Sequence, residues 1–289
     1  MLDLIVSTLS QGILWSLLAI GVFITFRVLD VADLTVEGSF PLGAAITATL
    51  LVGGMNPIPA LFIATLGGMI AGVVTGILHT KLKIPALLAG ILSMIALYSV
   101  NLRVMGKANI PLLGTDTIYD FGNSLGMEPI WSVLAVGLLV TGILFLVLFF
   151  FFGTEIGVSL RATGANPQMI RAQGVNTDNM IVLGLLISNG FVALSGGLIA
   201  QSNGFADVGM GIGTIVIGLA SVIIGEVLFG ANGFVQNLVS VILGSVVYRI
   251  VIAAVLYMGM PPNDLKLFTA IIVAIALSLP LIKSKWLSR

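Results

Sequence analysis

The sequence contains no cysteine and only one histidine, His79, among its 289 residues. These absences exclude disulfides, thiol nucleophiles and metal sites built from cysteines or clustered histidines. A serine, histidine and acid triad would need His79, which lies in a basic turn with no acid nearby in the sequence. The motif G-x-x-x-x-G-K-[ST] is absent as well, so a P-loop cannot hold a nucleotide in this chain. We therefore expect no catalytic centre.

Charged residues are scarce too, at 8% of the chain, and the formal net charge is +0, so no basic surface suited to nucleic acid is expected. In contrast, 58% of the residues are hydrophobic and the mean hydropathy is +1.18. A soluble domain cannot bury that much apolar surface, and the apolar runs are continuous, unlike the short alternating segments of a β-barrel. The composition predicts an all-α polytopic membrane protein with one transmembrane domain over residues 1–289.

The apolar runs predict about nine transmembrane helices, within a range of about eight to ten. The first run lacks the basic start of a cleavable signal and is long enough to span. The second run is short and glycine-rich, so a broken helix is the alternative to a full crossing. The predicted spans are residues 4–26, 39–55, 57–78, 84–100, 129–152, 181–200, 211–229, 234–257 and 265–282.

Basic residues distribute unevenly between the two sets of connections that nine alternating spans create. One set holds Arg27, Lys81, Lys83, Arg161, Arg171, Lys283, Lys285 and Arg289, and the other holds Arg103, Lys107 and Lys266. The richer side is expected to be cytoplasmic, which places the segment 153–180 and the C-terminus inside the cell. The loop 101–128 and the N-terminus are then outside, unless the run 39–55 fails to cross, in which case the N-terminus changes sides.

The segment 153–180 is a long polar stretch between two apolar runs. Asn166 and Pro167 form a typical helix start, and Gly174 suits the position after a helix end, so a helix is expected over 167–173. A second short helix is expected over 155–163, stopped by Gly164. Helices this short are not stable alone in water, so the pair needs a surface to pack against. The alternative is a solvated connecting loop with one amphipathic turn.

Three acids, Asp30, Asp33 and Glu37, lie next to the second apolar run, although ionisable groups at membrane depth are costly. They fit either a solvated loop beside Arg27 or the break of a discontinuous helix that lines a transport path. We favour the break, because the following apolar run is too short to need so long a polar lead-in.

Other polar residues lie within the predicted spans. Arg249 is expected to form a structural pair or to reach toward the interface, with contact to a ligand carboxylate as the alternative. Glu226 could face the segment 153–180. The glycines of Gly209–Gly213 fit bending or close packing better than phosphate binding, because no strand-like run precedes them. The candidate path residues are Asp33, Thr35, Glu37, Ser39, Asn189 and Arg249.

Several motifs together resemble one family. The stretch TEIGVSLRATGANPQMIRAQGVN resembles the cytoplasmic coupling loop of ABC importer permeases, in the branch that serves branched-chain amino acids, ribose-type sugars and nucleosides. The stretch DLTVEGS is similar to that branch's D-L-S-V-G-S segment, with Glu37 as an additional acid. Three further stretches resemble a bacterial subgroup of this branch that is linked to amino-acid uptake, often of tryptophan or tyrosine. They are ITFRVLDVADLTVEGSFPLGAA, LHTKLKIPALLAGIL and GMPPNDLKLFTA.

This resemblance covers nearly the whole chain and implies a partnership. Such permeases work as dimers, often of identical chains, in the bacterial plasma membrane. Each coupling loop docks on a cytoplasmic ATPase subunit, which binds the ATP and magnesium, so no cofactor is implied for this chain. An extracellular binding protein, a lipoprotein in some bacteria, delivers the solute. The implied docking residues are Arg161, Ala162, Gly164, Asn166, Pro167, Arg171, Gly174 and Asn176.

Three other functions stay open on the sequence alone. Broken helices and the acids Asp30, Asp33 and Glu37 would also suit an ion-coupled secondary transporter. The same permease branch includes importers of sugars and nucleosides. A membrane subunit that only assembles a complex and moves no solute is the third alternative.

Overall fold

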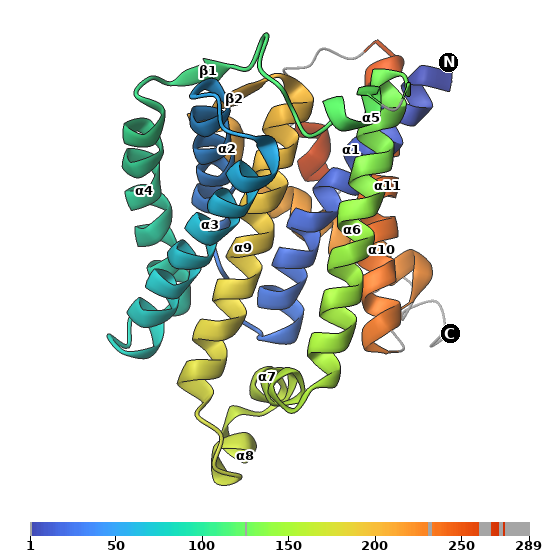
Figure 1. Ribbon diagram of the computed structural model, residues 1–289. Coiled ribbons are helices and arrows are strands. Elements are labelled where there is room, and N and C mark those ends of the chain that lie inside the picture. Colours follow the sequence, from blue (N-terminus) through green and yellow to red (C-terminus); the bar gives the residue numbers. More distant parts are fainter. Residues whose placement is uncertain (1, 125, 231–232, 260–266, 272–273, 275–289) are drawn as a thin grey trace.

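The computed structural model describes residues 2–124, 126–230, 233–259, 267–271 and 274. Its helices and strands run in one order along the chain (Figure 1). They are α1 (Leu2–Phe23), the π-helical turn η1 (Ile24–Val28), α2 (Val36–Val52), α3 (Pro57–Thr80), α4 (Ala86–Met105), β1 (Asn109–Pro111), α5 (Asp120–Ser124), α6 (Pro129–Gly153), α7 (Glu155–Ala165), α8 (Pro167–Ala172), α9 (Thr177–Asn203), β2 (Phe205–Asp207), the 3₁₀ turn η2 (Val208–Gly211), α10 (Thr214–Phe229) and α11 (Phe234–Tyr257).

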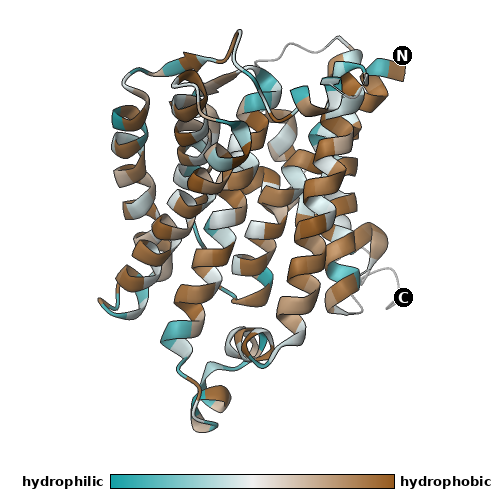
Figure 2. Ribbon diagram, in the orientation of Figure 1, coloured by the Kyte–Doolittle hydropathy of each residue, from teal (hydrophilic) through white to brown (hydrophobic). Residues whose placement is uncertain are grey.

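Among the described residues, 7 helices are long and apolar enough to cross a membrane, and α2 is a shorter apolar helix. These eight elements correspond to the first eight predicted spans. The ninth, 265–282, lies outside the described residues except for 267–271 and 274, which are helical. Hydrophobic residues predominate along the long helices (Figure 2), and many of their large apolar side chains are exposed, as a bilayer requires.

Helices α1 and α9 form the centre of the bundle, whereas α4 and α6 lie at its edges (Figure 1). Small residues let the central helices pack closely. A Cβ added at Gly72 of α3 would lie 2.2 Å from the carbonyl oxygen of Leu185 in α9, and one at Gly43 of α2 would lie 1.9 Å from that of Ala193. Gly68, Gly72 and Gly76 recur at four-residue spacing along α3, and a Cβ added at each would lie 2.4, 2.2 and 2.9 Å from the nearest atom of α9.

Trp15, in the middle of α1, packs in this core. Its ring stacks on Phe40 of α2 with 5.2 Å between centroids. Both side chains are buried, and they fix α1 against the first turns of α2.

The polypeptide does not continue as a helix between α1 and α2. Residues 29–35 are non-helical, and α2 begins only at Val36. Asp33 and Thr35 are nevertheless buried, so this segment enters the bundle instead of lying in solvent. The second predicted span is one short continuous helix, and of the predicted break only Asp33–Thr35 is non-helical, because Val36–Ser39 belong to α2. The alternative of a solvated loop is wrong for Asp33.

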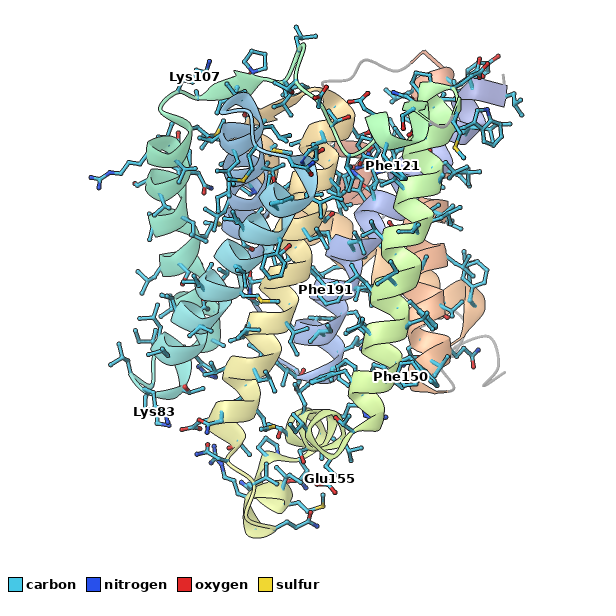
Figure 3. All side chains as sticks on the ribbon, in the orientation of Figure 1. Lys83, Lys107, Phe121, Phe150, Glu155 and Phe191 are labelled. Atoms are coloured by element: carbon cyan, nitrogen blue, oxygen red, sulfur yellow. The ribbon has the colours of Figure 1, made fainter. Side chains whose placement is uncertain are left out.

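The two ends of the bundle carry different structures. The N-terminal end of α1, the β1–β2 ribbon and α5 lie at one end, and α7 and α8 lie at the other (Figure 1). Lys107 and Phe121 mark the first end, and Lys83 and Glu155 mark the second (Figure 3). In the ribbon, Ile110 pairs with Ala206, and Tyr119 donates a hydrogen bond of 2.9 Å to the carbonyl of Leu198. The long predicted loop is thus a folded cap over one end of the bundle.

Candidate functional site

The segment 153–180 folds as two short helices, as predicted. The Thr154 hydroxyl accepts a hydrogen bond from the Gly157 amide at the start of α7, and the Asn166 carboxamide accepts one of 3.0 Å from the Met169 amide at the start of α8. Gly174 then adopts a left-handed conformation, with φ of +88°, which glycine tolerates without strain. The predicted caps of α8 are confirmed, and its last helical residue is Ala172 instead of Gln173.

Gly164 does not stop the first of these helices, contrary to prediction. Helix α7 continues to Ala165 and ends because Pro167 forces an extended backbone on Asn166, whose φ and ψ are −157° and 90°. Gly164 instead permits close contact with η1. A Cβ at this position would lie 1.9 Å from the carbonyl oxygen of Val28.

Arg161 faces the bundle instead of the surrounding solvent. Its Nη2 donates a hydrogen bond of 3.2 Å to the carbonyl of Phe152, and its guanidinium lies 5.3 Å from the centre of the Phe234 ring. Arg161 and Gly164 therefore fix α7 to α6, η1 and α11, and Ala162 is partly buried with them. The exposed members of the predicted docking set are Asn166, Pro167, Arg171, Gly174 and Asn176.

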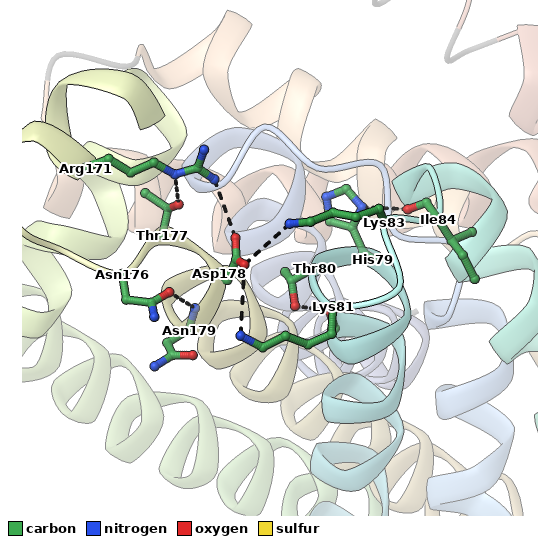
Figure 4. A network of polar contacts seen from close by, with 11 residues as sticks. His79, Thr80, Lys81, Lys83, Ile84, Arg171, Asn176, Thr177, Asp178 and Asn179 are labelled. Carbon is green, nitrogen blue, oxygen red and sulfur yellow. Dashed lines mark hydrogen bonds and ion pairs between the residues drawn. The ribbon is translucent and has the colours of Figure 1, made fainter.

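Arg171, near the C-terminal end of the segment 153–180, and the turn between α3 and α4 are joined through Asp178 (Figure 4). Its Nε donates a hydrogen bond to Thr177, and its Nη2 lies 3.5 Å from Asp178. The same carboxylate lies 3.5 Å from the Lys83 ammonium and 4.0 Å from that of Lys81. No role for Asp178 was predicted from the sequence, although Lys81, Lys83 and Arg171, which fall in the same set of connections, offered the signal.

A cleft of about 810 Å³ lies beside the contacts of α7 and is lined by residues of η1, α7, α10 and α11. Arg27 of η1 and Glu226 of α10 form an ion pair in its wall, in which Arg27 Nε donates a hydrogen bond of 2.9 Å to Glu226 Oε1. Arg161 and Gly164 line the same cleft. The prediction that Glu226 faces this segment is confirmed.

A chain of polar side chains crosses the interior of the bundle. Asp33 accepts hydrogen bonds from the Thr35 amide, at 2.9 Å, and from the Asn189 carboxamide, at 2.7 Å. Ser39 donates to the Asn189 carboxamide oxygen at 2.6 Å, and the Thr35 hydroxyl continues the chain to Thr75 of α3, at 2.8 Å. All five side chains are buried. Four predicted path residues, Asp33, Thr35, Ser39 and Asn189, therefore lie together.

The other two predicted path residues lie elsewhere. Arg249 of α11 places its guanidinium 4.2 Å from the centre of the Trp15 ring, and among the described residues it has no ion pair with an acid. Glu37 accepts a hydrogen bond of 3.0 Å from the Gly213 amide at the start of α10.

Asn101 of α4 was assigned to a loop, because the predicted span ended at residue 100. In the structure α4 continues to Met105, and Asn101 is buried beside Gly38. The Gly209–Gly213 stretch makes close contacts, as expected, since a Cβ at Gly211 would lie 2.0 Å from the carbonyl oxygen of Glu37. Among the described residues, no group of three or more histidines and acids could hold a metal ion.

Comparisons with known proteins agree with this architecture. Residues 4–277 match the family model of the branched-chain amino acid transport system permease component. The chain is 44% identical over 269 residues to a tyrosine transport system permease protein of Clostridioides difficile (strain R20291), covering 93% of this chain and 88% of that protein.

Two more distant similarities point the same way. An autoinducer 2 import system permease of Yersinia pseudotuberculosis, LsrC, is 30% identical over 62% of this chain and 49% of its own length. A solved structure, described as a metal-chelate type ABC transporter in an inward-facing conformation, superimposes with a TM-score of 0.51 at 16% identity, over 98% of this chain and 85% of that one. This last likeness concerns the fold alone. The chain therefore belongs to the family of branched-chain amino acid transport system permeases, the membrane subunits of ABC importers.

Proposed function

We propose that this permease imports an aromatic amino acid, tyrosine or a close analogue. The observation that carries the proposal is the 44% identity to a tyrosine transport system permease over 93% of this chain. Membership of an ATP-driven family argues against the ion-coupled alternative. A sugar-like solute stays an outcome of the test, because the more distant LsrC imports autoinducer 2.

In this proposal the tip of the segment 153–180 docks on a separate ATPase subunit, which binds ATP and magnesium and carries out the hydrolysis. The tip presents Asn166, Pro167, Gln168 and Met169 in exposed positions, and the Met169 side chain is 49% exposed. An exposed apolar side chain beside polar groups suits the centre of a small protein interface. The position of this tip at one end of the bundle supports a cytoplasmic assignment for that end, together with Lys81, Lys83 and Arg171.

The inner residues transmit the movement of the docked tip. Gly164 contacts Val28 at the end of η1, which continues from α1, and Arg161 contacts Phe152 and Phe234. A displacement of α7 by the ATPase would thus act on α1, α6 and α11 at once. Because packed helices shift as rigid elements between discrete arrangements, this connection supports alternating opening of the bundle.

The transporter would contain a second permease, in the simplest case an identical copy, and an extracellular binding protein that presents the solute. The folded cap formed by β1, β2 and α5 lies at the end opposite α7 and α8 and is the surface that such a binding protein would contact. In a bacterium, the complex would lie in the plasma membrane.

The experiment is co-purification of the ATPase with the tagged permease, followed by uptake in proteoliposomes. Met169→Glu places a charge at the exposed tip without removing an internal contact, unlike a change at Arg161. We expect this variant to lose most of the bound ATPase and of the ATP-driven tyrosine uptake. Leu113→Glu, at a side chain that is 89% exposed in the opposite cap, is the control and should keep the ATPase.

Two results would contradict the proposal. Retention of the ATPase by Met169→Glu would remove the docking assignment. Uptake of a sugar, with no uptake of any amino acid by the wild-type complex, would remove the substrate assignment and leave the docking assignment standing.

A further inference from the structure

A second cavity lies away from the segment 153–180, between α2, α4 and η2, and has a volume of about 510 Å³. This volume falls in the range of about 300–1,000 Å³ that is typical of small-ligand sites. Its lining includes Glu37 and Pro41 of α2, Met94, Tyr98 and Asn101 of α4, and Ile212. Most of its surface is thus apolar or aromatic, with a few polar groups.

The cavity lies beside the first turn of α2 and the connection that leads into α10. Helix α2 begins at Val36 after the non-helical residues 29–35, and α10 begins after η2 at Gly213, which has a φ of +85°. The Gly213 amide donates a hydrogen bond to Glu37 Oε1, which joins the two helix starts. Non-helical backbone at membrane depth is tolerated where it is buried in protein or lines a cavity, and the residues before α2 and before α10 meet that condition here.

Asn101 lines this cavity and carries a carboxamide oxygen that no described residue engages. The side chain is fully buried, and its Nδ2 donates a hydrogen bond of 3.1 Å to the carbonyl oxygen of Gly38, which fixes the orientation of the amide. Its Oδ1 is buried and has no hydrogen-bond partner within the described part of the chain. A buried acceptor without a donor costs free energy, so a ligand that brings N–H groups would be stabilised here.

The carboxylate of Glu37 is the second acceptor that lines the cavity. A primary ammonium group carries three N–H donors and a positive charge, and its hydrogen bonds to a carboxylate are among the stronger ones in proteins. A hydroxyl-rich neutral sugar would use the same acceptors without the charge.

We propose that this cavity is a solute site in which Glu37 and Asn101 bind the α-ammonium group of the transported amino acid. Met94, Tyr98, Pro41 and Ile212 would contact its apolar or aromatic side chain. This inference rests on the proposed amino-acid transport, and it adds the residues that distinguish an amine from a solute without one.

The natural absence of cysteine allows a direct test, because a single introduced cysteine is the only thiol in the permease. Met94→Cys would be placed in the cavity, in the assembled transporter in proteoliposomes, and its reaction with a water-soluble thiol reagent followed. We expect L-tyrosine and tyramine to slow the reaction at least fivefold. The des-amino analogue 3-(4-hydroxyphenyl)propanoate should have no effect. Leu113→Cys, in the exposed cap, should react without protection by any of the three compounds.

The variant Glu37→Gln tests the charge separately from the fold. The glutamine carbonyl can still accept the Gly213 hydrogen bond, so the helix starts stay joined while the negative charge is removed. We expect Glu37→Gln to abolish protection of Met94→Cys by tyramine and to lower tyrosine uptake at least tenfold, with the ATPase still bound.

The outcomes separate the two proposals. Protection by the des-amino analogue but not by tyramine, or by no solute while tyrosine uptake proceeds, would overturn the cavity assignment and leave the importer intact. Protection by amines other than tyrosine, without tyrosine uptake, would support the cavity and overturn the proposed substrate. If Glu37→Gln fails to fold, the protection pattern of Met94→Cys alone still decides the question.

Discussion

Asn189 and Asp33 lie 156 positions apart in the sequence, and their side chains meet inside the bundle with 2.7 Å between Asn189 Nδ2 and Asp33 Oδ2. The same carboxamide also donates to the Leu185 carbonyl and accepts from Ser39. Asn189 of α9 is therefore a hydrogen-bond partner both of the non-helical segment before α2, through Asp33, and of the first turn of α2, through Ser39. In a bilayer, which offers no water to replace these bonds, this contact stabilises the non-helical entry to α2.

Asn189→Leu should destabilise the permease strongly. The change leaves the Asp33 carboxylate and the Ser39 hydroxyl buried without their partner, and each buried polar group that loses its hydrogen bond costs about 1–3 kcal/mol, and more where the group is charged. Ser39→Ala removes one hydrogen bond only and should cost about 0.6–1 kcal/mol. Thermal unfolding of the two variants in the same detergent measures the difference. Equal melting temperatures would contradict the central role of Asn189.

Gly164→Ala should disturb the contact between α7 and η1. The added Cβ would meet the Val28 carbonyl oxygen, which belongs to the backbone and cannot rotate away. Overpacking of this kind costs about 1–3 kcal/mol and would displace α7. We expect ATP hydrolysis to continue with lower tyrosine uptake. The matched control is Gly153→Ala, where no atom lies within 4 Å of the added Cβ. Wild-type uptake by both variants would show that α7 transmits no movement at this point.

The sequence predicted the eight described spans, because continuous apolar length is a direct property of the residues. It also predicted a break near the start of α2, because three acids beside so short an apolar run are difficult to explain otherwise, and of that break only Asp33–Thr35 is non-helical. Gly164 was misread, since a glycine in a helix looks the same whether it ends the helix or admits a neighbouring backbone. Asn101 was missed for a related reason: only the tertiary contact with Gly38 shows that the helix continues past residue 100.

The cap over the other end of the bundle should depend weakly on pH. Asp120 accepts hydrogen bonds of 2.7 and 2.8 Å from the amide and hydroxyl of Thr117, and these bonds lower the pKa of its carboxyl group. A lowered folded-state pKa means that the stabilisation is fully present above the unfolded value of about 3.9 and is lost as the pH falls through the folded value.

Amide hydrogen exchange at Thr117 measures this effect. We expect protection at neutral pH that Asp120→Asn reduces, because a neutral acceptor forms weaker bonds. The difference between the wild-type protein and the variant should disappear in acid, below the folded pKa of Asp120. If the wild-type protein and Asp120→Asn still differ in Thr117 protection at that acidic pH, the protection comes from packing around Tyr119 and not from the ionised carboxylate.

Arg27 and Glu226 should be coupled in transport as well as in stability. Arg27 belongs to the π-helical turn that ends α1, Glu226 lies near the end of α10, and both line the cleft beside α7. A π-helical turn often marks a functional position within a helix. If the cleft has one shape before α7 moves and another afterwards, the Arg27–Glu226 ion pair stabilises one of these two shapes.

The charge-reversal variants Arg27→Glu and Glu226→Arg each place like charges together, and the double variant restores an opposite pair. We expect each single variant to lower ATP-driven uptake and the double variant to recover most of it. Because the Arg27 side chain is 47% exposed, solvent screens the pair, and a coupling of only about 1 kcal/mol in thermal stability is expected. If the double variant recovers thermal stability but not uptake, the ion pair has only a structural role. An ion pair that stabilises one conformation of the transport cycle requires that stability and uptake both recover when the opposite charges are restored.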